Sequence, residues 1–136
     1  MDNSETIIKK THPHPFYFFI FYFSGIVFVI CSFFFSWILF AIGILVFILG
    51  EVTRRAETFY ILESGVGREY RLLSTSREFA SYNKIQNMKV SQSFLDNILG
   101  IGNVHFDTAG ADSTEVNFHG IKNPYEIERM VREKIK

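Results

Sequence analysis

An uncharged stretch from Phe16 to Gly50 constrains the fold of this chain more than any other feature. Its 35 residues contain no Asp, Glu, Lys or Arg, and they hold eleven of the 16 Phe in the protein. The stretch is much longer than the apolar region of a cleaved signal peptide, which spans about 7–15 residues. A soluble domain of this size would not contain so long an uncharged segment in a chain of 136 residues, and a disordered chain has far fewer apolar side chains. The stretch therefore predicts a protein of the cell membrane.

Two short helices fit the uncharged stretch better than one. A single helix would be roughly 52 Å long at about 1.5 Å per residue, whereas the hydrocarbon core of a bilayer is only about 30 Å thick. We therefore expect a transmembrane hairpin over residues 15–54, with helices at about 15–31 and 36–53. The turn between them is expected at Ser32 to Ser36, where two serines bracket three phenylalanines.

Basic residues at both ends of the hairpin set its expected orientation. Lys9 and Lys10 precede the first helix and Arg54 and Arg55 end the second, while the turn carries no charge. By the positive-inside rule both ends face the cytoplasm, so the chain is multi-pass with both termini cytoplasmic and residues 1–14 are an N-terminal tail. We interpret these four residues as lying at the membrane surface. Arg54 and Arg55 are either a simple stop-transfer anchor or, more specifically, a site for anionic lipid.

Aromatic residues and glycines complete the description of the hairpin. Tyr17 and Trp37 lie near opposite ends of the expected helices, where aromatic rings anchor a protein at the two membrane interfaces. Gly25, Gly43 and Gly50 allow close helix packing, although they form no repeat of small residues four apart. The uncharged stretch offers no ionisable side chain for a transport path, which argues against a transporter.

Charge and cysteine content exclude two further classes of protein. The net charge is zero, and the part from Glu51 onward has twelve basic and twelve acidic residues. A nucleic-acid-binding protein usually has a basic excess, so nucleic acid is not an expected partner. Cys31 is the only cysteine, which excludes a disulfide framework or a thiolate metal site within one chain.

The remaining part of the chain, residues 57–136, predicts a small α+β domain of short strands and one final helix. A helical turn at Phe94 to Leu99 interrupts the strands, and Gly100 and Gly102 end it. Asn123, Pro124 and Glu126 form a capping-box pattern at the start of the final amphipathic helix. The expected strands are 57–62, 66–73, 77–82, about 85–90, 104–108 and 116–118.

A series of short motifs resembles a known family. They include, in order, His-Pro before two apolar helices and then Glu57–Leu62, Lys84–Asn87, Gln92–Asp96, Leu99–Val104, Asp107–Gly110 and Gly120–Pro124. The chain resembles prokaryotic membrane proteins with a pleckstrin-homology-like domain, the YdbS-like group, over nearly its whole length. The resemblance implies a PH-like β-barrel or sandwich capped by the C-terminal helix, behind the two-helix anchor. It implies neither an enzymatic activity nor a specific ligand.

The strongest candidate for a metal site is the pair His105 and His119. If Phe106 pairs with Phe118 in a hairpin, the two histidines face each other on the side away from the core, where they are either a zinc site or two surface histidines. His12 and His14 are two more potential ligands, but no third is near and their neighbouring prolines mark the start of the helix. We therefore expect no metal site.

Other motifs have simpler structural interpretations. Gly100 and Gly102 lack the third glycine and the preceding strand of a dinucleotide fingerprint. Asp107–Gly110 departs from the aspartic-protease motif by one residue and has no second copy to complete a dyad. Five basic residues remain as candidates for phosphoinositide binding, but the first hairpin loop, Glu63–Gly65, is acidic; these residues are Arg68, Arg71, Arg77, Lys84 and Lys89.

Two functions remain after these exclusions. The first is a membrane-anchored binding module that holds a protein partner, or another copy of itself, at an open sheet edge or in a groove beside the C-terminal helix. The second is a protein that responds to anionic lipid. We predict no catalytic residue and no cofactor, because no nucleophile–base pair, carboxylate pair or ligand cluster stands out.

Overall fold

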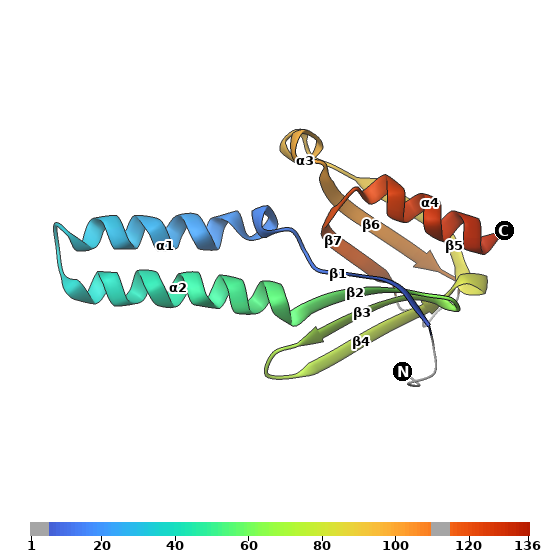
Figure 1. The fold of residues 1–136 in the computed structure, drawn as a ribbon, viewed down its shortest axis with the longest axis horizontal. Helices are drawn as coiled ribbons and strands as arrows, with labels where there is room; N and C mark the ends of the chain where they lie inside the picture. The colour runs from blue at the N-terminus through green and yellow to red at the C-terminus, as the bar shows by residue number, and fades with distance from the viewer. Residues whose placement is uncertain (1–5, 110–114) are drawn as a thin grey trace.

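The chain has an α+β fold, as predicted: two apolar helices precede two antiparallel sheets and a C-terminal helix (Figure 1). This computed structural model describes residues 6–109 and 115–136. The sheets stack as an open sandwich and do not close into a barrel over the described residues. The helical hairpin projects from one end of the sandwich, and the C-terminus lies at the other.

The helical hairpin begins with the 3-10 turn η1 (Pro15–Phe18), which continues into α1 (Phe19–Ser32). The second helix, α2, runs from Trp37 to Ala56 and is capped by the Ser36 hydroxyl. The predicted turn between Ser32 and Ser36 is therefore confirmed, and α2 extends three residues beyond its predicted end.

Glycines form the contact between α1 and α2. A Cβ atom on Gly43 would lie 2.8 Å from the carbonyl oxygen of Gly25, and one on Gly50 would lie 2.8 Å from the Cβ of Phe21. These separations are shorter than ordinary van der Waals contacts, so the absence of side chains allows the two backbones to approach. The three glycines thus act in packing even though they form no repeat.

The first sheet has the strand order β1-β2-β3-β4, and β1 is its unexpected member. Its strands are β1 (Ile7–Thr11), β2 (Glu57–Leu62), β3 (Gly65–Arg71) and β4 (Thr75–Ser81). The sequence predicts a tail over these residues, whereas the structure pairs β1 antiparallel with β2. β1 adds hydrogen bonds at the edge of the sheet, and none of its residues is buried. A strand without a buried face needs no alternation of apolar and polar residues, so the sequence shows no pattern that would reveal it.

The second sheet has the order β5-β6-β7. It follows η2 (Tyr82–Lys84) and consists of β5 (Ile85–Ser91), β6 (Ile101–Thr108) and β7 (Val116–Lys122), with α3 (Phe94–Leu99) between β5 and β6. Gly100 ends α3 at a φ of 66°, a left-handed conformation that favours glycine. This confirms the predicted role of Gly100 in a tight turn from helix to strand.

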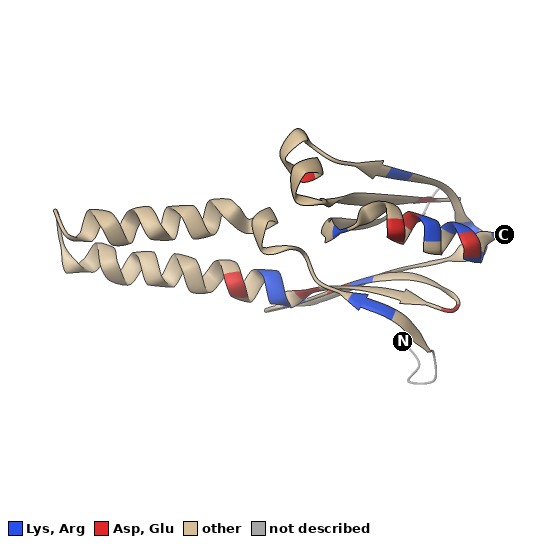
Figure 2. Cartoon of the chain, turned by 45° about the horizontal axis from the view of Figure 1, so that its top comes forward, with Lys and Arg blue, Asp and Glu red and all other residues tan. Residues whose placement is uncertain are grey.

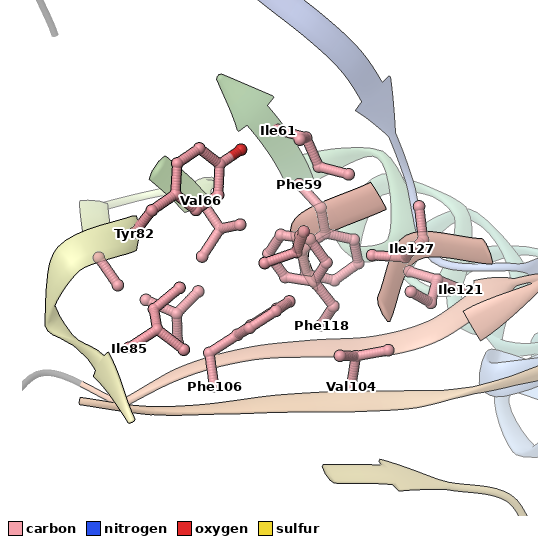
Figure 3. Packing of buried hydrophobic residues seen from close by; sticks show 13 residues of the cluster. Phe59, Ile61, Val66, Tyr82, Ile85, Val104, Phe106, Phe118, Ile121 and Ile127 are labelled. Atoms are coloured by element: carbon pink, nitrogen blue, oxygen red, sulfur yellow. The ribbon is translucent and has the colours of Figure 1, made fainter. Parts of the chain in front are cut away.

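The core lies between the two sheets and under the last helix, α4 (Pro124–Ile135) (Figure 3). Phe118 connects the layers: its ring centroid is 4.8 Å from that of Phe59 on β2 and 5.1 Å from that of Phe106 on β6. Ile127 and Val131 on α4 are also buried and close the open side of the sandwich.

The start of α4 differs from the predicted capping box. Asn123 does precede the helix and Pro124 takes its first position, but Asn123 has a φ of 52° and its side chain makes no capping hydrogen bond. In this left-handed conformation the backbone carbonyl still accepts from Glu126 N at 3.0 Å. A complete capping box occurs instead on α3, between Ser93 and Asp96.

Candidate binding surfaces

The junction between the hairpin and the sandwich is held by three hydrogen bonds from residues 12–14 and α2. His14 N donates to Gly120 O at 2.6 Å, the His12 ring contacts Glu57 O at 2.9 Å, and Arg54 donates to Pro13 O at 3.4 Å. These contacts tie the segment before η1 to β7, β2 and α2. The sandwich is therefore fixed relative to the hairpin and does not hang from a linker.

The predicted membrane-surface arginines lie at the end of α2, beside Glu51. The Glu51 carboxylate accepts from Arg54 at 2.8 Å, from Arg55 at 2.6 Å and from the Tyr22 hydroxyl of α1 at 2.8 Å. Arg54 is largely covered, whereas the Arg55 side chain is 74% exposed. Arg55 is thus the better placed of the two to meet lipid headgroups. In Figure 2 the remainder of the hairpin carries no charge.

The predicted membrane-surface lysines lie on β1 and have partners within the domain. Lys9 forms an ion pair with Glu126 of α4 at 3.0 Å, which joins β1 to the C-terminal helix. Lys10 lies over the ring of Tyr60, 5.6 Å from its centroid. Both contacts help attach β1 to the sandwich, a role that sequence analysis did not assign to them.

The two predicted interface anchors occupy different environments. Trp37 lies at the far end of the hairpin and is 79% exposed, as an anchor requires. Tyr17 is half exposed, and its ring stacks on His119 with a centroid separation of 6.0 Å. Tyr17 therefore also packs the start of the hairpin onto β7; its position at a membrane interface stays a prediction.

The predicted register of the β6–β7 hairpin is wrong by two residues. Val104, not Phe106, pairs with Phe118, and His105 pairs with Asn117. A bulge between Gly102 and Val104 shifts the strands, and this bulge is not visible as a change in the alternating pattern.

The shift makes His105 and His119 diagonal neighbours, with ring centroids 6.2 Å apart. The Nδ1 atom of His105 contacts the Asn117 side chain at 2.7 Å, and Tyr17 covers His119. Burial lowers the pKa of His119 below its ordinary value of 6.5. Within the described residues, which include His12 and His14, no group of three or more His, Cys, Asp or Glu side chains is arranged to hold a metal ion.

Three of the five basic candidates for phosphoinositide binding are in ion pairs. Arg68 lies 2.6 Å from Glu57 and 3.5 Å from Glu78. Burial disfavours its charge, but the two carboxylates outweigh this effect and raise the pKa of the guanidinium. Arg71 and Arg77 both pair with Glu69. The three arginines thus lie in two separate groups of ion pairs whose carboxylates neutralise them, which makes each group a poor site for a phosphate.

A groove lies between β5 and the end of α4. It has a volume of about 300 Å³ and is lined by residues of β5 and α4: Ile85, Gln86, Asn87, Met88, Arg132, Ile135 and Lys136. Within the described part of the chain, β5 pairs only with β6, so its outer edge is unpaired. The combination of a free strand edge and an adjoining, partly apolar groove matches the way extended peptides add to a sheet.

Comparison with known proteins agrees with this architecture. A family model described as Bacterial PH domain matches residues 16–135, which include both helices and nearly the whole sandwich. The chain belongs to the bacterial PH domain family. The resemblance noted from the sequence motifs is therefore confirmed, as is the PH-like sandwich capped by a C-terminal helix. Neither the curated proteins nor the solved structures contain a match.

Apolar side chains are exposed at two places that the sequence did not predict to be surfaces. Leu72 and Leu73 form the turn between β3 and β4, and α3 exposes Phe94, Leu95, Ile98 and Leu99. The helical spacing of the second set was recognised, but spacing alone does not show whether such a face is covered. The sequence predicts Leu72 and Leu73 at the end of the strand 66–73, where apolar residues usually indicate core, so no local signal marks the first set as exposed.

Proposed function

We propose that this bacterial PH protein is a membrane-anchored binding module whose β5–α4 groove captures an extended segment of a protein partner. The hairpin is the anchor, and the groove is the site. The single observation that carries the proposal is the edge of β5 that has no strand partner among the described residues, beside a groove of about 300 Å³.

Membrane insertion of the hairpin is supported by its exposed apolar surface. The segments Pro15–Ser32 and Trp37–Ala56 are long and apolar enough to cross a bilayer, and only 11% of each is buried. The core helix of a soluble protein would be mostly buried. Lipid is the environment that makes this exposed apolar surface favourable.

The proposed orientation has both ends of the hairpin in the cytoplasm. β1 precedes the hairpin, β2 follows it, and the two strands pair in one sheet. Both ends must then lie on the same side of the membrane, which supports an even number of crossings. Arg54 and Arg55 assign that side to the cytoplasm by the positive-inside rule.

The groove suits an extended peptide. An added strand gains backbone hydrogen bonds along the outer edge of β5, and every second side chain faces the sheet surface. Ile85, Met88 and Ile135 provide an apolar part of the groove wall, while Arg132 and Lys136 lie beside it. The partner segment is therefore expected to alternate apolar and polar residues. It belongs either to another protein or to a second copy of this chain.

A photo-crosslinking amino acid at Asn87, on β5, tests the proposal in the full chain in native membranes. We expect crosslinks that map to one contiguous segment of one protein. The substitution Ile135→Glu should reduce them because it places a charge in the groove. Tyr125→Glu, an exposed change at the other end of α4, serves as the matched control.

A second probe position defines the result that would refute the groove. Arg77 is exposed on β4, one of the two edge strands of the other sheet. Equal crosslinking from positions 77 and 87, or crosslinking from position 87 that Ile135→Glu does not change, would contradict a site between β5 and α4. Crosslinks to lipid alone would contradict a protein partner.

A further inference from the structure

Two apolar surfaces of the sandwich have no partner within the described residues. We call Leu72 and Leu73 the β3–β4 tip, and we call Phe94, Leu95, Ile98 and Leu99 the α3 apolar face. Leu73 is 101% exposed, Phe94 is 81% exposed and Ile98 is 67% exposed. Large apolar residues gathered on a surface usually mark a contact with protein or membrane.

The β3–β4 tip is a tight turn made from unusual residues. Arg71 pairs with Thr75, so only three residues connect the strands, and Leu72 N donates to Ser74 O at 3.2 Å. Such short hairpin loops usually consist of Gly, Asn, Asp or Ser, which adopt turn conformations easily and favour water. Leucines contribute nothing to the turn itself, and Leu73 has no covering within the sandwich.

The α3 apolar face is likewise not needed to hold its own helix. Local bonds fix both ends of α3: Ser93 and Asp96 form the capping box, and Gly100 closes the C-terminus. None of the residues from Phe94 to Leu99 is buried. The helix is therefore stabilised by its caps while it presents four apolar side chains outward.

Both surfaces lie at the end of the sandwich from which the hairpin projects. Figure 1 shows the β3–β4 turn and α3 on opposite sides of the hairpin, close to the level where η1 and the end of α2 meet the sheets. If the hairpin stands in a bilayer, the membrane surface lies at this level.

We propose that the β3–β4 tip and the α3 apolar face insert into the lipid interface on either side of the hairpin and fix the orientation of the sandwich on the membrane. The inference rests on the proposed membrane insertion of the hairpin. A bilayer is the one partner that surrounds the hairpin and meets both surfaces at once. A single protein partner would have to reach around the hairpin to cover both.

This arrangement complements the proposed binding site. The β5–α4 groove is lined by the last residues of α4, at the end of the sandwich opposite the hairpin (Figure 1). Three points of membrane contact, namely the hairpin and the two apolar surfaces, would prevent the sandwich from tilting. The groove would then face away from the lipid, toward a partner in solution.

Tryptophan fluorescence in the full chain, reconstituted into vesicles with brominated acyl chains, tests the docking. Trp37 is the only tryptophan, so Trp37→Phe provides a silent background. In that background we expect Leu73→Trp and Phe94→Trp to lose fluorescence to the brominated lipid and to shift to the blue. Ile135→Trp, at the opposite end of the sandwich, is the matched control and should keep its fluorescence.

Quenching of Trp37 in the wild-type protein reports whether the hairpin itself is in the membrane. It therefore distinguishes a sandwich that does not dock on the lipid from a hairpin that does not insert. Quenching of Trp37 together with unquenched probes at positions 73 and 94 would overturn the docking and leave the anchored hairpin intact. An unquenched Trp37 would overturn both. Because positions 73 and 94 are exposed, their substitution by Trp does not disturb the core.

Discussion

The tight contact at Gly43 between α1 and α2 predicts that Gly43→Leu pushes the two helices apart. A Cβ atom at this position would lie 2.8 Å from Gly25 O, 2.8 Å from Val29 Cγ2 and 3.0 Å from Val29 N. Ordinary carbon contacts are about 3.5–4.0 Å, so even the first added carbon requires a shift of several tenths of an ångström. The remaining leucine carbons require more.

The expected loss of hairpin stability in Gly43→Leu follows from these contacts. Overpacking a tight contact costs about 1–3 kcal/mol, and replacing Gly in a helix returns somewhat under 1 kcal/mol of helix propensity. Apolar burial does not compensate in lipid, because the acyl chains are as apolar as the leucine. Gly43→Leu should therefore destabilise the hairpin by about 1–2 kcal/mol. Ala41→Leu, on the exposed side of α2, should have little effect.

The assay is detergent-induced unfolding of the full chain, followed by the fluorescence of Trp37 at the hairpin turn. The midpoint of the transition is compared among the wild type, Gly43→Leu and Ala41→Leu. A Gly43→Leu hairpin as stable as the Ala41→Leu control would refute the argument that Gly25 and Gly43 set the helix separation.

Three smaller predictions concern the sandwich. Tyr82→Phe removes the hydroxyl that donates to Leu62 O at 2.6 Å in a buried position, and should lower the free energy of unfolding by about 1–2 kcal/mol in urea titrations; an unchanged midpoint would contradict this. The pKa of His119 is lowered by burial, so below about pH 6.5 the unfolded state binds more protons and stability should fall with acid; His119→Asn should flatten this dependence, and equal slopes would count against it. Hydrogen bonding from Lys9 lowers the pKa of Glu126, so this pair stabilises the fold at neutral pH and less as the carboxyl protonates in acid. In a double-mutant cycle, Lys9→Met and Glu126→Gln should show a small coupling that disappears in high salt, and a salt-independent coupling would disprove a surface ion pair.

Much of the secondary structure was predictable because its signals are local. The hairpin helices follow from the uncharged stretch and its serines, and strands such as Glu57–Leu62 follow from aromatic and β-branched residues between turn signals. α3 is recognisable from its apolar spacing and its following glycines. The family resemblance added the stacking of these elements into a PH-like sandwich, which local patterns do not specify.

The features that escaped prediction depend on long-range pairing. β1 is a strand only because β2, 46 positions or more away in the sequence, offers a free edge. The register of His105 depends on a bulge that follows Gly102 and leaves the alternation of apolar residues unchanged. Lys9 carries a charge typical of a membrane flank, but its partner, Glu126, comes from the opposite end of the chain.

The type of candidate binding site was predictable from the sequence, but the strand that forms it was not. An open sheet edge and a groove beside the last helix were expected from the fold class. The structure then singles out β5, because β5 is an edge strand and lines a groove together with α4. The exposure of the β3–β4 tip could not be predicted, since two leucines in a sequence usually indicate core.

Thiol accessibility tests the central claim, an anchor that crosses the membrane and holds the sandwich on the cytoplasmic side. In a Cys31→Ser background, Ser36→Cys places one thiol at the hairpin turn and Glu133→Cys places another on exposed α4. With a membrane-impermeant maleimide on intact spheroplasts, we predict labelling at position 36 and none at position 133 until the membrane is opened. Labelling of both from the outside, or of neither until the membrane is opened, would contradict the account.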